Sequence, residues 1–287
     1  MTKWDGKTKG SLLGYKFFVF CIRTFGLRIA YFFCLNVSVH FILVAKKQRH
    51  GLMQFYRDGF GFSGWKAFRM AVSCFNRFGQ TLVDRIAVQT RHRKRFTHTF
   101  INETALLETA ANGQGGILLS GHVGNWEIAG NLIRERITSS INIVMLDAEV
   151  EKVKEFLKSK TGGPGYNLIP IKDDLSHLIL IHAALKRKEL VAIHADRVSE
   201  SGKVIVKDFL GKPAAFPAGP FILASKFKVP VFMVYGVKTT ARHYELSAKE
   251  IILGSEEEIA AQYVDHLETM VRKYPDQWFN FYNYYAD

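Results

Sequence analysis

From residue 103 onward, helical and extended patterns alternate, and this alternation is the strongest constraint on the fold. Short apolar runs bounded by turn residues predict strands, and the longer segments between them have the apolar spacing of helices. Strands are predicted at 117–120, 141–146, 167–171, 190–194, 203–209, 230–237 and 243–249, and helices at 103–111, 125–135, 150–160, 173–187, 217–228 and 255–273. Such alternation indicates an α/β fold, in which helices flank a sheet.

The formal net charge of +13 arises entirely from the first third of the chain. Residues 1–100 contain 18 Lys and Arg but 3 Asp and Glu, a net charge of +15, whereas residues 101–287 have a net charge of −2. An apolar content of 48% and a charged content of 23% exclude a disordered, collagen-like or coiled-coil chain. We therefore predict a basic, aromatic helical region at 1–100 and an α/β domain at 101–287.

Residues 11–45 form the most hydrophobic segment, and their longest uncharged run, Ile29–Ala45, has 17 residues. As a helix this run is about 25 Å long, slightly less than the roughly 30 Å of a bilayer core. A break is expected at Gly26, so three interpretations stay open: a short or tilted transmembrane helix, an interfacial helical hairpin, or a buried hairpin of a soluble core. Membrane contact is favoured because a basic flank, typical of the cytoplasmic side, follows at once: Lys46, Lys47, Arg49 and His50.

A helical pattern over residues 52–90 leads into the basic cluster Arg91–Arg95. Next to an apolar anchor, this cluster favours an anionic membrane surface or a phosphorylated substrate. The acidic C-terminal region does not extend a basic groove, so no nucleic-acid partner is expected. The three cysteines, Cys21, Cys34 and Cys74, are odd in number and lie in apolar surroundings, so we expect no disulfide framework. No His/Cys spacing typical of zinc exists, and we expect no metal.

The segment 118–127, LLSGHVGNWE, has the clearest chemical pattern in the chain. A buried strand ends at Ser120, and His122 and Glu127 then stand five residues apart across a strand-to-helix turn. A carboxylate on one imidazole nitrogen fixes the tautomer and raises the basicity of the other nitrogen. We predict that Glu127 orients His122 as a general base, while the helix N-terminus and the flanking glycine amides stabilise developing negative charge. Gly121 and Gly124 are expected to let a substrate approach the backbone.

This segment resembles the His-x4-Asp/Glu motif of the lysophospholipid acyltransferase superfamily. Its residues Ser-Gly-His-x-Gly-Asn-Trp-Glu resemble the lipid A late acyltransferase branch of that superfamily. Four other segments are similar to that branch in the same order: Gly14–Tyr31, Ala195–Arg197, Asp208–Pro213 and Tyr274–Phe279. The resemblance implies a glycerolipid-acyltransferase-like mixed sheet flanked by helices, with an N-terminal membrane-associating helical region.

The resemblance also implies an activity: transfer of a fatty acyl chain from an acyl carrier protein or coenzyme A thioester to a hydroxyl or amine of a membrane lipid, lipid A-like or other. His122 and Glu127 would be catalytic, and no cofactor beyond the thioester co-substrate is implied. The implied location is the bacterial inner membrane, with the catalytic domain facing the cytoplasm. Candidate substrate-binding residues are Gly121, Asn125, Trp126, Asp196, Arg197, Gly211 and Lys212.

The chain departs from the branch at positions that concern the acceptor. Arg197 stands where the branch usually has Gln, so a structural ion pair with Asp196 and a substrate-positioning function both stay open. The branch has an Arg-rich segment after the strand that corresponds to 141–146, but this chain has the acidic residues Asp147, Glu149 and Glu151 there. The identity of the acceptor lipid therefore stays open. Two alternative functions also stay open, a thioesterase using the same His/Glu pair on water and a non-catalytic membrane- or nucleic-acid-binding module.

Overall fold

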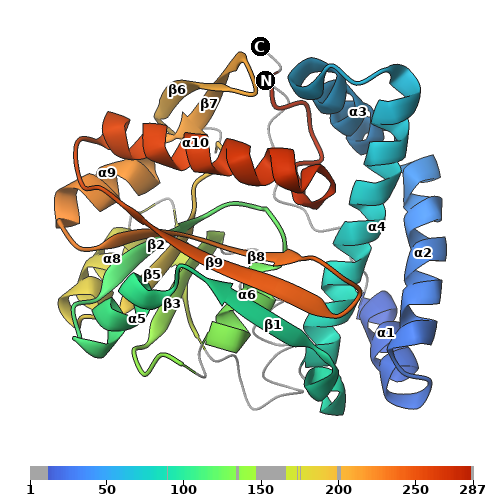
Figure 1. Ribbon diagram of the computed structural model, residues 1–287, viewed down its shortest axis with the longest axis horizontal. Helices are drawn as coiled ribbons and strands as arrows, with labels where there is room; N and C mark the ends of the chain where they lie inside the picture. Colours follow the sequence, from blue (N-terminus) through green and yellow to red (C-terminus); the bar gives the residue numbers. More distant parts are fainter. Residues whose placement is uncertain are drawn as a thin grey trace.

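The computed structural model describes residues 12–88, 90–133, 136–146, 166–172, 174, 176–198 and 202–285. A central sheet lies between helices, and four N-terminal helices form a layer along one side of it (Figure 1). The predicted α/β class, with a mixed sheet flanked by helices, is confirmed.

The N-terminal layer begins with a helical hairpin. Its two helices are separated at Gly26, whose φ of 83° lies in the left-handed region that favours glycine, and the expected break is confirmed. A second pair of helices is separated by a turn at Gly61, where a single helical region had been predicted. The four helices are α1 (Leu12–Thr24), α2 (Leu27–Val44), α3 (Lys46–Phe60) and α4 (Gly64–Val88).

Helix α2 packs on α4 along one stripe and exposes an apolar face on the other. The buried residues recur every three or four positions, which is the spacing of one helical face: Leu27, Ala30, Cys34, Ser38 and Ile42. On the opposite face, Phe32 is 60% exposed and Leu43 is 64% exposed. Among the described residues, α2 is the one helix long and apolar enough to cross a membrane. It is therefore a candidate membrane-associating element.

The main sheet has seven strands in the order β1-β9-β8-β2-β5-β3-β4. All neighbouring pairs are parallel except β8 and β9, which are antiparallel. A separate two-stranded antiparallel sheet is formed by β6 and β7. The strands are β1 (Thr97–Ile101), β2 (Gly116–Ser120), β3 (Ile141–Leu146), β4 (Asn167–Ile171), β5 (Leu190–His194), β6 (Val204–Phe209), β7 (Lys212–Pro217), β8 (Val231–Lys238) and β9 (His243–Ile251).

The predicted elements from residue 103 onward are confirmed within a few residues, apart from the helix expected at 150–160, which lies outside the described residues. The prediction missed two strands, β1 and β7. Because β1 pairs with β9, the boundary proposed at 100/101 falls inside a strand of the main sheet. The remaining helices are α5 (Thr104–Ala111), α6 (Trp126–Ile133), α8 (Ser176–Lys186), α9 (Ala218–Phe227) and α10 (Glu256–Lys273), with 3-10 helices η1 (Arg91–Arg95) and η2 (Pro275–Gln277).

Strand β2 is the central element that positions the site. All five of its residues are buried, and it lies between β5 and β8, both parallel to it. Ser120, the last residue of β2, is in register with His194, the last residue of β5. The loops that follow these two strands therefore leave the same edge of the sheet side by side, which is where α/β proteins bind their ligands.

Candidate active site

The imidazole of His122 lies in the loop after β2 and is bonded to a buried carboxylate from the loop after β5. Its Nδ1 lies 2.7 Å from Oδ1 of Asp196, and the His122 backbone N–H donates to Oδ2 of the same carboxylate over 2.7 Å. The His122 carbonyl accepts a hydrogen bond of 2.9 Å from the N–H of Phe279. Both the ring and the backbone of His122 are thereby fixed.

Asp196 is completely buried, and its charge is satisfied by donors from two directions. In addition to His122, the indole Nε1 of Trp278 donates to Oδ2 over 2.8 Å. Burial alone raises the pKa of the Asp196 carboxyl, but the charge and hydrogen bond of His122, followed by the charge of Arg197, outweigh it and hold the pKa well below its usual range. Asp196 is therefore an anion at neutral pH, and it favours a proton on the Nδ1 of His122.

Glu127 is in the first turn of α6, as predicted, and pairs with a cation that the sequence analysis did not single out. Its carboxylate forms a buried ion pair with Arg85 from α4. The prediction gave Glu127 the task of orienting His122, whereas the carboxylate found on Nδ1 is that of Asp196. Glu127 instead connects α6, which follows the His122 loop, to the N-terminal helical layer.

The loop glycines pack against the protein itself. A Cβ at Gly121 would lie 3.0 Å from both Asp196 Oδ2 and Tyr263 Oη, so the absent side chain makes room for these groups. Gly124 adopts a φ of 72° and its N–H donates to the Gln277 carbonyl over 2.8 Å. Their missing side chains are required for internal packing, and a substrate at these glycines stays a prediction.

Asn125 is also a structural residue in this arrangement. It is buried, its Oδ1 accepts from the N–H of Ile128 over 3.2 Å, and its Nδ2 donates to the Thr81 carbonyl over 3.1 Å. Its own N–H donates to the Gly236 carbonyl over 2.7 Å. The backbone N–H groups of His122 and Gly124 also donate within the protein. These three amides are therefore not available to form the predicted oxyanion site.

The other predicted binding residues have separate positions. Trp126 is half-buried beside the site, and its ring centroid is 5.7 Å from that of His194. Arg197 donates to the Asn280 side chain over 3.0 Å and to the Phe279 carbonyl over 2.7 Å, so it holds the C-terminal segment. Gly211 and Lys212 belong to the β6–β7 hairpin, and Lys212 pairs with Asp58 at 3.4 Å.

His194 lies against the ring of His122, with 4.6 Å between the ring centroids. Its Nδ1 is buried and has no hydrogen-bond partner among the described residues. Burial, helped by the nearby positive charge of His122, lowers the pKa of His194 to about 3, against the opposing charge of Asp196. His194 is therefore a neutral imidazole at neutral pH, with an unsatisfied nitrogen beside His122.

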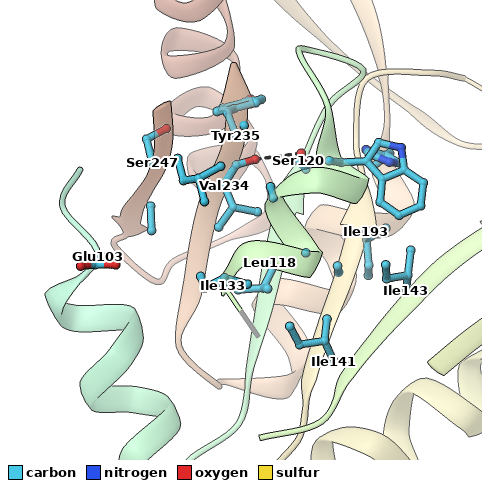
Figure 2. Close-up of a pocket in the computed structure, with 18 of the residues that line it drawn as sticks. Glu103, Leu118, Ser120, Ile133, Ile141, Ile143, Ile193, Val234, Tyr235 and Ser247 are labelled. Carbon is cyan, nitrogen blue, oxygen red and sulfur yellow. Dashed lines mark hydrogen bonds between the residues drawn. The ribbon is translucent and has the colours of Figure 1, made fainter. Parts of the chain in front are cut away.

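Figure 2 shows an apolar pocket between α6 and the sheet, and His194 is one of its lining residues. The hydrophobic side chains of Leu118, Ile133 and Ile141 pack together there, and Ser120 donates to the Val234 carbonyl over 2.8 Å. His194 both lines the pocket and contacts the ring of His122, which is not itself part of the lining. Its lining is Phe100, Glu103, Leu118, Ser120, Trp126, Ala129, Gly130, Ile133, Ile141, Ile143, Ala192, Ile193, His194, Val234, Tyr235, Gly236, Leu246, Ser247 and Ala248.

Sequence reasoning missed Arg85 and Trp278 as supports of the site. Arg85 carries no local signal, because it is one of many cations in a helical region. Trp278 was noted only as part of a C-terminal signature. In the described part of the chain, no group of three His, Cys, Asp or Glu side chains is placed to hold a metal ion.

Comparison with known proteins gives one result that covers almost the whole chain. Residues 12–286 match the family described as bacterial lipid A biosynthesis acyltransferase. A search of curated protein sequences found no match. The match includes the N-terminal hairpin, the His122 loop and the C-terminal segment that supports Asp196.

Proposed function

The chain belongs to the bacterial lipid A biosynthesis acyltransferase family, and we propose that this acyltransferase moves a fatty acyl chain from a thioester donor to a hydroxyl or amine of a membrane lipid, with His122 as the general base. The donor is an acyl carrier protein or coenzyme A thioester. The observation that carries the proposal is the contact of His122, held by the buried Asp196, with His194, which lines an apolar pocket.

The pocket supports an acyl donor because its walls are almost entirely hydrocarbon. Strands β2, β3, β5, β8 and β9 and helix α6 contribute Ile, Leu, Val and Ala side chains to it. Burial of each methylene of a chain in such a pocket is worth about 0.8 kcal/mol. An acyl chain inserted here would place its thioester beside His194 and His122, at the edge of the sheet where the acceptor can approach.

The proposed chemistry uses one base and no covalent enzyme intermediate. Nε2 of His122 takes the proton from the acceptor hydroxyl or amine as the acceptor atom bonds to the thioester carbon. The resulting tetrahedral intermediate collapses, the C–S bond breaks, and the proton on Nε2 passes to the leaving thiolate. Asp196 stabilises the imidazolium formed in between, because its carboxylate faces Nδ1.

We assign stabilisation of the oxyanion to His194. Its ring is next to His122, lines the acyl pocket, and has a buried nitrogen in need of a partner. A neutral imidazole can donate a hydrogen bond to an oxygen that gains negative charge, without releasing its proton. Glu127 and Arg85 would act as positioning residues, since their ion pair connects α6, which lines this pocket, to α4.

The pH dependence of kcat/KM tests this assignment. His194, with its pKa near 3, stays neutral and Asp196 stays ionised at every pH above about 4, so neither group titrates in the working range. Activity falls as the pH decreases because His122 gains a proton and can no longer accept one. We expect a single-proton acid limb in log kcat/KM, with a slope of about 1. A limb of slope 2 would contradict the neutral state of His194.

We place α1 and α2 in the membrane interface, on the cytoplasmic side of the inner membrane. Proteins of this family are membrane-associated, and α2 has the composition of a membrane helix. Its buried stripe, however, packs on α4, which also carries the Arg85–Glu127 ion pair of the catalytic body. A helix attached in this way suits a hairpin lying along the bilayer surface with its exposed aromatic residues among the lipids.

A donor-and-acceptor assay distinguishes acyl transfer from simple hydrolysis. The full chain is incubated with a radiolabelled acyl carrier protein thioester or acyl coenzyme A, with and without extracted membrane lipid. We expect the label to move to lipid and little free fatty acid to form without lipid. Equal thiol release in both conditions, with the label in free fatty acid, would show a thioesterase and overturn the proposal.

Gly130 offers a test of the acyl pocket. This residue of α6 lines the pocket, and a Cβ added to it would meet no heavy atom within 4 Å. We expect Gly130→Leu to fill part of the pocket and to shift the preferred donor to chains shorter by about two to four methylenes. Competition between thioesters of different length measures the shift. Gly219→Leu is the matched control, because Gly219 is also a helical glycine in open space but does not line the pocket; an equal shift in both variants would contradict the placement of the chain.

A further inference from the structure

A second pocket lies at the foot of the α1–α2 hairpin, and its walls come from three separate parts of the chain. The hairpin turn contributes Phe25 and Gly26, and α2 adds Leu27, Arg28 and Tyr31, while η1 and the β8–β9 turn close the other sides. Figure 1 shows the foot of the hairpin beside the β8–β9 turn at the lower right of the molecule. The lining is Phe25, Gly26, Leu27, Arg28, Tyr31, Arg95, Ala241 and Arg242, none of which lines the acyl pocket.

Three arginines face this pocket, one from each wall. Arg28, Arg95 and Arg242 are exposed, and none of the ion pairs among the described residues includes them. No acidic side chain belongs to the lining. Cations gathered round a concavity without a counter-charge repel one another, and a bound anion relieves this repulsion.

Asp84, a buried acid bonded to the Tyr31 of the pocket wall, is paired with Lys238 rather than with an arginine of the lining. Asp84 accepts from Lys238 over 2.6 Å and also from the hydroxyls of Tyr31 and Tyr244. This buried cluster fixes the pocket wall instead. The Tyr31 hydroxyl also lies 3.2 Å from the carbonyl oxygen of Ala241, which brings α2 against the β8–β9 turn.

The surroundings of the pocket are those of a membrane interface. Phe25, in its lining, is 58% exposed, and Phe20 on α1 and Phe32 on α2 are 57% and 60% exposed. Exposed aromatic side chains next to arginines are typical of the depth at which lipid headgroups lie. An anion that enters this pocket at that depth meets guanidinium groups on one side and acyl chains on the other.

We propose that this arginine pocket binds the phosphate of an anionic membrane lipid, distinct from the acceptor, and holds the hairpin foot on the bilayer surface. Guanidinium groups suit phosphate because their planar donors match two oxygens at once. A free phosphate offers the same oxygens, but it lacks the acyl chains that the exposed phenylalanines would contact. The inference goes beyond the proposed transfer reaction, because a bystander lipid in this pocket takes no part in the chemistry.

Vesicle binding by the full chain tests the proposal without any acceptor lipid or donor present. The probes are phosphatidylcholine vesicles with and without phosphatidylglycerol, and the variants are Arg95→Gln/Arg242→Gln and a control, Lys94→Gln/Lys226→Gln. The control removes two exposed cations, one from η1 itself, that do not line the pocket. We expect the pocket variant to bind phosphatidylglycerol vesicles about tenfold or more weakly than wild type, and the control less than about threefold. Binding to pure phosphatidylcholine should be equal in all three.

Three outcomes would overturn the proposal. Equal losses in both variants would show that diffuse surface charge is enough. A loss on pure phosphatidylcholine would mean that the substitutions disturb the hairpin, which circular dichroism and the thermal midpoint report independently. Binding of inorganic phosphate to the wild type as tightly as phosphatidylglycerol vesicles, at an ionic strength matched with chloride and lost in the pocket variant, would identify a free-phosphate site. Because none of these measurements needs turnover, the result stands apart from the proposed acyl transfer.

Discussion

His122→Ala is expected to lower kcat by about 10²- to 10⁴-fold, the usual contribution of a positioned general base. The variant should fold, because Asp196 would keep two of its donors, the backbone N–H of His122 and the indole of Trp278. Transfer of labelled acyl chain to lipid measures kcat, and the thermal midpoint measures folding.

The matched control for this variant is His182→Ala. His182 is exposed on α8 and does not line the acyl pocket, so its removal should leave kcat within a factor of about two. A His122→Ala protein that still acylates lipid at the wild-type rate would eliminate His122 as the base, and the proposed mechanism with it.

Asp196→Asn is the second change with a large expected effect, because it alters charge without altering shape. The buried carboxylate accepts from three N–H groups, and an amide at this place brings an NH₂ group against one of them. If the NH₂ group faces Nδ1, the imidazole must carry its proton on Nε2, where the base is needed. We expect kcat to fall by about 10²- to 10⁴-fold and the free energy of unfolding to decrease by about 1–3 kcal/mol.

Glu127→Gln distinguishes the function of the Glu127 carboxylate from that of Asp196. It breaks the ion pair with Arg85 and is expected to reduce activity through the position of α6. In a double-mutant cycle, the loss of activity in Glu127→Gln/Arg85→Gln should therefore be close to that of either single variant. The loss caused by Asp196→Asn should add to that of each of them. If Asp196→Asn is nearly as active as wild type while Glu127→Gln is inactive, the carboxylate predicted from the sequence is the one that matters, and Asp196 has been assigned wrongly.

The difference between prediction and structure at His122 has a topological cause. The sequence pattern showed that β2 ends before His122 and that β5 ends before Asp196, but a pattern of separate strands does not give their order in a sheet. Once β5 pairs with β2, the residues that follow Ser120 and His194 must meet. Glu127 is close in sequence, yet the first turn of α6 directs it to Arg85 on α4.

The two missed strands show what local patterns omit. Strand β7 contains Pro213 and Pro217, which argue against a strand in the interior of a sheet, and it forms only a two-stranded sheet with β6. Strand β1 is at the edge of the main sheet, and its residues are alternately exposed and half-buried, so it lacks the apolar run that marked β2. Its position depends on β9, about 140 residues later in the chain.

The order in which the chain is synthesised gives the C-terminal segment a particular consequence. Trp278 donates one of the hydrogen bonds to Asp196, and the backbone of Phe279 forms hydrogen bonds with both His122 and Arg197. A ribosome makes these residues after the hairpin, the sheet and every other part of the site. Under the proposed function, the hairpin would therefore emerge and meet lipid before the imidazole of His122 is supported, and a chain that lacks the C-terminal segment would be inactive at the membrane.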